Sequence, residues 1–178
     1  HELGSGAARG LSLNVPLEPF TESESYLEAF EAVVPRALEQ FAPQVLVVQA
    51  GADAHFADPL GDLALTTQAF ETLYRRILAL AAEHTQGRVL FTLGGGYEAQ
   101  VVARVWTILT LTLMDLPIPE ALPEAWLARW KDLLGPEVGR TLHDPIPAYP
   151  EFPGREERAR RNRDVVDRLL DSLLRYWF

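Results

Sequence analysis

The chain has 178 residues, 48% of them hydrophobic and 10% aromatic, and its 16 lysines and arginines against 25 aspartates and glutamates give a net charge of −9. This length and composition predict one folded domain and exclude a disordered chain. The negative charge argues against general binding to nucleic acid or to an anionic membrane surface. Because there is no cysteine, disulfides and thiolate metal ligands are excluded.

The longest apolar stretch, residues 101–114, is interrupted by Arg104. It falls short of the roughly 20 residues that a membrane-spanning helix needs, and no basic-then-apolar leader opens the chain. We therefore expect a cytoplasmic protein with no membrane partner. The glycine-rich residues 1–10 begin without methionine and resemble a loop inside a domain, which suggests that a segment precedes them.

The first elements follow from apolar spacing. Residues 11–15 alternate and stop at Pro16, which predicts a short strand. A capping sequence at residues 21–24 begins a helix whose apolar residues recur every three or four positions as far as Phe41. Residues 45–48 form a continuous apolar run, which is typical of a strand buried on both faces.

The next elements repeat this order. A second helix is capped at Thr66-Thr67 and ends near Gly87. Residues 89–93 form another apolar strand, and a third helix begins just after the Gly-Gly-Gly-Tyr sequence at 94–97. Alternating strands and helices predict an α/β fold with a parallel sheet. Ligands bind beyond the carboxyl ends of such strands, so we expect a site there.

The remainder of the chain is predicted to contain a short helix over residues 123–134 and a charged helix with an apolar stripe over residues 155–178. We divide the chain into residues 1–150, the α/β domain, and residues 151–178, an amphipathic helix that packs on this domain or on a partner. Its arginine-rich start contains acidic residues as well, so we interpret it as a solvated helix face and not as a nucleic-acid patch.

Asp53 and His55 follow the first apolar strand. If the chain stays extended, both side chains point to one side and could share a zinc ion. The alternative is a turn in which Asp53 bonds to backbone amides and His55 is exposed. Spacing alone favours the turn.

The glycines at 94–96 precede Tyr97 and a helix. Their amides could attract an anion, but the lysine and hydroxyl residue of a P-loop are missing. Two alternatives are a close approach of the backbone to a narrow substrate, with Tyr97 supplying a hydroxyl, and a tight turn with a core tyrosine. On the helix that follows, we expect Arg104 to tie the helix to a loop carboxylate.

Four motifs occur in an order that resembles the zinc-dependent histone deacetylase family, and in particular its bacterial acetoin-utilisation deacetylases. The resemblance covers residues 1 to 115. The motifs are Asn14-Val15-Pro16-Leu17, Gly51-Ala52-Asp53-Ala54-His55 with Asp58-Pro59-Leu60-Gly61, Leu93-Gly94-Gly95-Gly96-Tyr97, and Ala103-Arg104-Val105-Trp106.

The resemblance implies a three-layer arginase/deacetylase fold, in which helices flank a parallel sheet and zinc lies beyond the strand ends. It makes Asp53 a zinc ligand and Tyr97 the residue that hydrogen-bonds the acetyl carbonyl. It also implies that Leu60, Gly95 and Gly96 line the tunnel for the acylated side chain.

The resemblance assigns His55 and Asp58 a supporting or structural role beside the site. His55 is not the histidine that binds zinc in the family, so the idea that Asp53 and His55 share a metal ion is withdrawn. The other zinc ligands and the paired histidines that act as general base are expected upstream of this chain.

The implied function is part of a zinc-dependent amidohydrolase that removes acetyl groups from lysine. Since one carboxylate cannot hold catalytic zinc, we expect this chain alone to be inactive, and to pair with an upstream half or with itself. Two alternatives stay open: an acetylpolyamine amidohydrolase acting on small acetylated amines, and a non-catalytic fragment that binds a partner.

Overall fold

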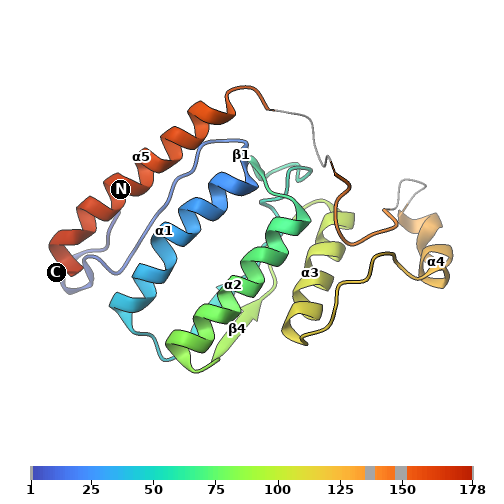
Figure 1. Cartoon of the computed structure of the whole chain (residues 1–178), viewed down its shortest axis with the longest axis horizontal. Helices are drawn as coiled ribbons and strands as arrows, with labels where there is room; N and C mark the ends of the chain where they lie inside the picture. The colour runs from blue at the N-terminus through green and yellow to red at the C-terminus, as the bar shows by residue number, and fades with distance from the viewer. Residues whose placement is uncertain (1, 135–138, 147–151, 178) are drawn as a thin grey trace.

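The structure is a computed structural model that describes residues 2–134, 139–146 and 152–177 (Figure 1). No helix among these residues is both long enough and apolar enough to cross a membrane. In chain order the elements are η1 (Gly6–Ala8), β1 (Thr21–Glu22), α1 (Ser23–Phe41), β2 (Leu46–Gln49), β3 (Leu63–Ala64), α2 (Thr67–Thr85), β4 (Val89–Thr92), α3 (Ala99–Leu113), α4 (Glu124–Leu134) and α5 (Arg155–Trp177).

Two pairs of parallel strands make up the sheet structure of the described residues. β2 pairs with β4, with Leu46 opposite Val89 and Gln49 opposite Thr92. The two-residue strands β1 and β3 form the second pair. The predicted alternation of parallel strands and helices is confirmed. The sequence did not predict β1 and β3, because two residues are too few to show an alternating pattern.

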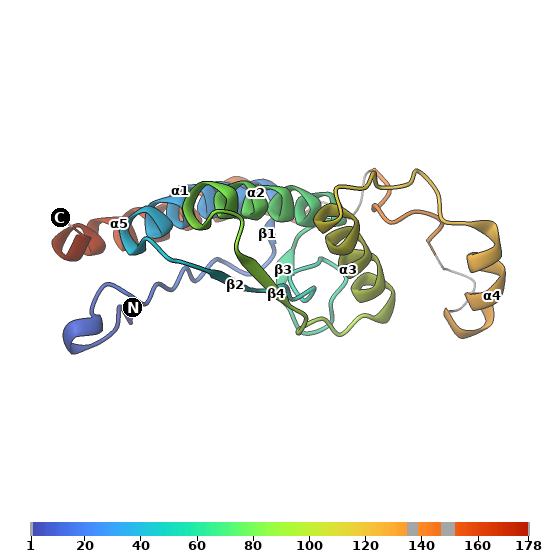
Figure 2. The ribbon, with the colours of Figure 1, turned by 90° about the horizontal axis from the view of Figure 1, so that it is seen from below.

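Helices α1, α2 and α5 lie on one side of the β2–β4 pair (Figure 2). The other side is open in the described part of the chain, where Val47 is 68% exposed and Leu90 is 56% exposed. The expectation that these apolar strands are buried on both faces is therefore wrong for the described residues. Side chains alternate along a strand, and only the set that faces the helices is covered.

Two hydrophobic clusters hold the helices in place. One lies where α2 packs against α3, and its buried members on these helices are Ala69, Phe70, Leu73, Tyr74, Val101, Val105, Ile108 and Leu109. The other lies between α1 and α5, and its buried members are Ala29, Val33, Val166, Leu169 and Leu173.

The predicted strand over residues 11–15 is wrong. The segment is extended but has no strand partner in the described residues, and it runs beside α1 and α5 (Figure 1). Its alternating apolar residues Leu13, Val15 and Leu17 pack against the α1–α5 cluster. The alternation therefore reflects packing on helices instead of a place in the sheet.

The helices begin and end close to their predicted positions. Thr66 caps α2 by accepting a hydrogen bond from the Ala69 amide, as predicted. The helix ends at Gln86 and Gly87, which both adopt positive φ angles of 56° and 78°. For α1, the expected side-chain cap is absent, because the N-cap residue Glu22 makes no such bond.

The start of α5 is joined to α1 and to the segment before it. Its arginines are solvent-exposed, as expected, but Arg155 also pairs with Glu22 at 2.8 Å and Arg163 with Glu28 at 3.3 Å. The Arg163–Glu28 pair is exposed on both sides and contributes little stability, whereas the Glu22 carboxylate of the other pair is buried. The buried Asn162 contributes more specifically, since its side chain donates to Thr21 and Ser25 and accepts from the Glu18 amide. The proposed division at residue 150 lies outside the described residues.

Packing of α5 on α1 predicts that neighbouring leucines respond differently to truncation. Leu173 is 0% exposed in the α1–α5 cluster, whereas Leu174 is 53% exposed. We expect Leu173→Ala to lower the free energy of unfolding by about 2–5 kcal/mol, and Leu174→Ala to change it by no more than about 0.5 kcal/mol. Urea denaturation of the two variants measures this difference. Equal losses would contradict the packing described.

Candidate active site

The loops that follow β2 and β4 stay in contact beyond the ends of the strands. The Ala50 amide donates to Thr92 O at 2.9 Å, and the Ala52 amide donates to Gly95 O at 2.8 Å. Parallel strands bring their carboxyl ends to the same edge of a sheet. The loop that carries Asp53 is therefore bonded directly to the glycine loop that precedes Tyr97.

The half-buried Asp53 carboxylate lies close to Gly51 and Gly95. A Cβ atom on Gly95 would lie 2.6 Å from Asp53 Oδ2, and one on Gly51 would lie 2.8 Å from Oδ1. Gly95 also has a φ of +88°, which a side chain disfavours. Among the described residues, no hydrogen-bond donor or cation contacts this carboxylate. The nearby Tyr26 phenol has a raised pKa, mainly because it is buried and also because of the Asp53 charge.

Asp58 fastens Tyr97 to the loop after β2. Its Oδ2 accepts a hydrogen bond from the Tyr97 amide at 2.7 Å, and its Oδ1 accepts from the Leu60 and Gly61 amides at 2.9 Å. Burial alone would raise the pKa of Asp58, but these hydrogen bonds outweigh it and lower the pKa. The backbone of Tyr97 is thereby held to the same turn as Leu60.

Leu60, Gly95 and Gly96, the three predicted substrate-binding residues, lie on the two loops that the Asp58 hydrogen bonds join. Leu60 is 67% exposed and Tyr97 is 59% exposed, so both side chains are accessible. Gly96 has a φ of +124°, and a Cβ there would lie 2.6 Å from Val102. Gly95 and Gly96 are therefore needed for the backbone path from β4 to α3, whereas Gly94 has room for a side chain. A role for Leu60, Gly95 and Gly96 in substrate binding stays a prediction.

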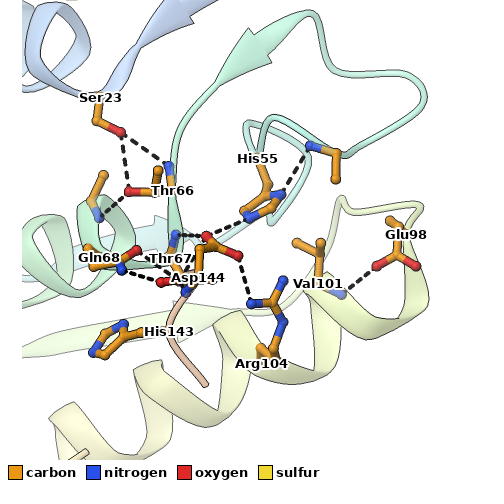
Figure 3. A network of polar contacts seen from close by, with 12 residues as sticks. Ser23, His55, Thr66, Thr67, Gln68, Glu98, Val101, Arg104, His143 and Asp144 are labelled. Carbon is orange, nitrogen blue, oxygen red and sulfur yellow. Dashed lines mark hydrogen bonds and ion pairs between the residues drawn. The ribbon is translucent and has the colours of Figure 1, made fainter. Parts of the chain in front are cut away.

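His55 is fully buried, and its ring points from its loop toward Asp144 (Figure 3). Its Nδ1 accepts from the Ala57 amide at 3.1 Å, so Nε2 carries the proton and donates to Asp144 Oδ2 at 3.0 Å. The alternative of an exposed His55 is wrong. A metal site shared with Asp53 is excluded as well, since both ring nitrogens bond to protein groups.

Asp144 is a second buried acid, and it joins three elements. Besides His55, it accepts from the amide and the hydroxyl of Thr67 at 2.7 and 2.9 Å, and from Arg104 at 2.7 Å. The expected bond between Arg104 and a loop carboxylate is thus confirmed. Burial alone would raise the pKa of Asp144, but the hydrogen bonds from His55, Thr67 and Arg104 hold it well below its usual range.

Sequence reasoning did not select Asp144 or Tyr26 as site residues. Tyr26 fits the apolar spacing of α1, and Asp144 lies outside the helices that the sequence predicts. The bond between His55 and Asp144 joins residues 89 positions apart, and no local pattern marks such a contact.

The described residues do not form a zinc site by themselves. They contain no group of three histidine, cysteine, aspartate or glutamate side chains that could hold a metal ion, and catalytic zinc takes three protein ligands. Asp53 offers one free carboxylate beside Gly51 and Gly95. This fits one ligand of such a site and not a complete one.

In this α/β protein parallel strands alternate with helices, and its likeness to two solved structures shows the arginase/deacetylase fold. The crystal structure of an HDAC homolog complexed with SAHA superposes with a TM-score of 0.76 at 24% identity, covering 94% of this chain and 44% of that one. The HDA15 HD domain gives a TM-score of 0.66 at 22% identity, covering 98% and 38%.

The chain belongs to the histone deacetylase family, whose domain pattern matches residues 1–113. It is 33% identical over 173 residues to the acetoin utilization protein AcuC of Bacillus subtilis (strain 168), and 31% identical over 179 residues to AcuC of Staphylococcus xylosus. These matches cover 97% and 99% of this chain but 45% of each relative. The chain therefore spans less than half the length of these relatives.

The position of the Asp53 carboxylate predicts that a side chain at Gly95 is more costly than one at a glycine with open space around it. Gly87 is a matched control, because its φ is +78° but a Cβ there would meet nothing within 4 Å. Backbone strain should cost Gly87→Ala about 1–2 kcal/mol of unfolding free energy, whereas Gly95→Ala should lose about 1 kcal/mol more because its methyl group collides with Asp53. Chemical denaturation compares them. Equal losses would show that the carboxylate is not held where described.

The lowered pKa of Asp144 predicts acid sensitivity. A carboxylate with a depressed folded-state pKa stabilises the protein above its unfolded pKa of about 3.9, and this contribution is lost as pH falls through the lower folded value. Denaturation between about pH 5 and pH 2 should therefore show a shallower loss of stability in Asp144→Asn than in the unaltered chain. The exposed-residue variant Asp132→Asn serves as the control. If Asp144→Asn leaves the change of unfolding free energy with pH unaltered, the hydrogen bonds with His55 and Arg104 do not stabilise the Asp144 carboxylate.

Proposed function

We propose that this chain forms the carboxyl-terminal part of a zinc-dependent deacetylase that hydrolyses acetyl-lysine. The observation that carries the proposal is the joining of two loops at one sheet edge. Asp53 lies on one loop and Tyr97 follows the other, and the bonds Ala52–Gly95 and Asp58–Tyr97 hold the two together.

Tyr97 is proposed to act on the acyl carbonyl. A hydroxyl that donates to this oxygen binds it more strongly once negative charge develops there, which favours the transition state over the substrate. Asp58 supports this role by fixing the Tyr97 backbone. Leu60 and the side-chain-free backbone of Gly95 and Gly96 would leave a narrow path suited to a thin acylated side chain.

Asp53 is proposed to supply one zinc ligand, and the other ligands and the general base are proposed to come from the part of the domain that the AcuC relatives have in addition. Zinc, when bound, polarises the amide carbonyl and lowers the pKa of a bound water. Since Asp53 alone cannot retain the ion, we expect no activity from residues 1–178 by themselves.

The open face of the β2–β4 pair supports the proposal that a further part of the domain packs there. Val47 and Leu90 project from it, and Val45 and Leu93 on the same two segments are also more than half exposed. Exposed apolar patches of this kind are usually contact surfaces. We propose that the rest of the deacetylase domain covers this face in the cytoplasm, and that the isolated chain associates with itself through the same face.

The experiment uses a hybrid in which residues 1–178 replace the matching part of Bacillus subtilis AcuC, with circular dichroism to establish folding. We expect zinc-dependent release of acetate from an acetyl-lysine peptide, and we expect Tyr97→Phe to lower kcat by about 10²–10³. Tyr176→Phe removes a hydroxyl from α5, away from the site, and should leave kcat unchanged. An acetylated polyamine in parallel reports on the small-amine alternative.

Two results would contradict the proposal. A folded hybrid whose Tyr97→Phe variant keeps full activity would remove Tyr97 from the reaction. Zinc-dependent acetate release by residues 1–178 alone would show that the chain needs no further ligands.

Asp53→Asn should leave the hybrid folded but without stoichiometric zinc, as measured by elemental analysis.

A further inference from the structure

Asp144 lies beyond residue 113, where the match to the family domain ends. Its carboxylate nevertheless contacts His55, Thr67 and Arg104, which lie within the matched part of the chain (Figure 3). It is anchored on two helices, by Thr67 at the start of α2 and by Arg104 on α3. Both of its oxygens are used, since Oδ1 accepts from Arg104 and Oδ2 from Thr67 and His55. Asp144 therefore transmits the position of α2 and α3 to the imidazole of His55.

His55 in turn organises the turn that separates Asp53 from Asp58. Its amide donates to Ala52 O at 3.2 Å, and its carbonyl accepts from the Asp58 amide at 2.9 Å. Its ring accepts from the Ala57 amide at 3.1 Å. A shift of the imidazole would therefore move the backbone that joins the two aspartates.

The path continues from the turn to the tyrosine, because Asp58 accepts the Tyr97 amide at 2.7 Å. We propose that Asp144 is a positioning residue of the site: through His55 and the turn at residues 52–58, it sets where Asp53 and Tyr97 stand. This inference rests on the proposed function for its catalytic meaning. The mechanical link itself is a property of the chain alone.

A competing role is that Asp144 only fastens residues 142–146 to the helices. Loss of its charge would then reduce overall stability and leave the turn unaffected. Asn162 offers a matched control, since it is another buried polar residue with bonds to several elements, and its partners Glu18, Thr21 and Ser25 are not site residues.

The test measures amide hydrogen exchange in the chain of residues 1–178, comparing Asp144→Asn with Asn162→Ala. We expect Asp144→Asn to speed exchange at the amides of Ala57, Asp58 and Tyr97 by about ten- to a hundredfold relative to other amides. Asn162→Ala should raise exchange according to its global stability without singling out these amides. The Nε2 proton of His55 should give a slowly exchanging NMR signal that Asp144→Asn removes.

His55→Gln tests the same link from the other side and serves if Asp144→Asn does not fold. It should speed exchange at Ala57 and Asp58 while the Thr67 amide, which bonds to Asp144, stays protected. Unchanged exchange at Ala57, Asp58 and Tyr97 in the folded variants would overturn the proposal. So would the same local increase in Asn162→Ala.

The hybrid enzyme gives an independent kinetic reading. Asp144→Asn should lower kcat by about ten- to a hundredfold with little change in KM, because misplaced groups slow the chemical step, whereas Asn162→Ala should leave both constants unchanged. An unaffected kcat would also overturn the positioning role. If the hybrid is inactive with every side chain intact, the proposed function fails, while the exchange data still decide whether the link exists.

Discussion

Parallel pairing of β2 with β4 brings two loops to one sheet edge, and the Ala50–Thr92 and Ala52–Gly95 hydrogen bonds extend that pairing past the strands. The short distance between the two loops explains the glycines at positions 51 and 95. With the loops so close, the Asp53 carboxylate lies beside Gly95, and a side chain at Gly95 would require this carboxylate to move. Loops joined in this way can present a carboxylate and a phenol to one ligand.

Three aspartates near this edge show how surroundings divide one residue type into separate roles. Asp53 has no donor among the described residues and is free to bind a ligand. Asp58 is occupied by backbone amides, including that of Tyr97. Asp144 is buried against His55 and Arg104 and serves as an anchor. For the proposed zinc site this division matters, because Asp58 and Asp144 fix the loop around Asp53 without using the oxygens of Asp53.

The sequence predicted the features that depend on local spacing. Helical periodicity located the helices, and the apolar runs located β2 and β4 with the polar residues at their ends. It could not predict β1 and β3, which are too short, or the open face of the sheet, which depends on what else packs there. The strand predicted over residues 11–15 is wrong because an alternation of apolar and polar residues can also arise in a segment that packs on helices. Asp144 was missed because its partners His55 and Thr67 lie 89 and 77 positions away.

The chain belongs to the histone deacetylase family and spans 45% of the length of its AcuC relatives. The most direct test is zinc-edge anomalous diffraction from crystals of the hybrid grown with zinc. The account predicts one strong peak about 2.0–2.2 Å from a carboxylate oxygen of Asp53, on the side that faces the Tyr97 hydroxyl. A bound zinc ion with no Asp53 oxygen among its ligands would contradict it.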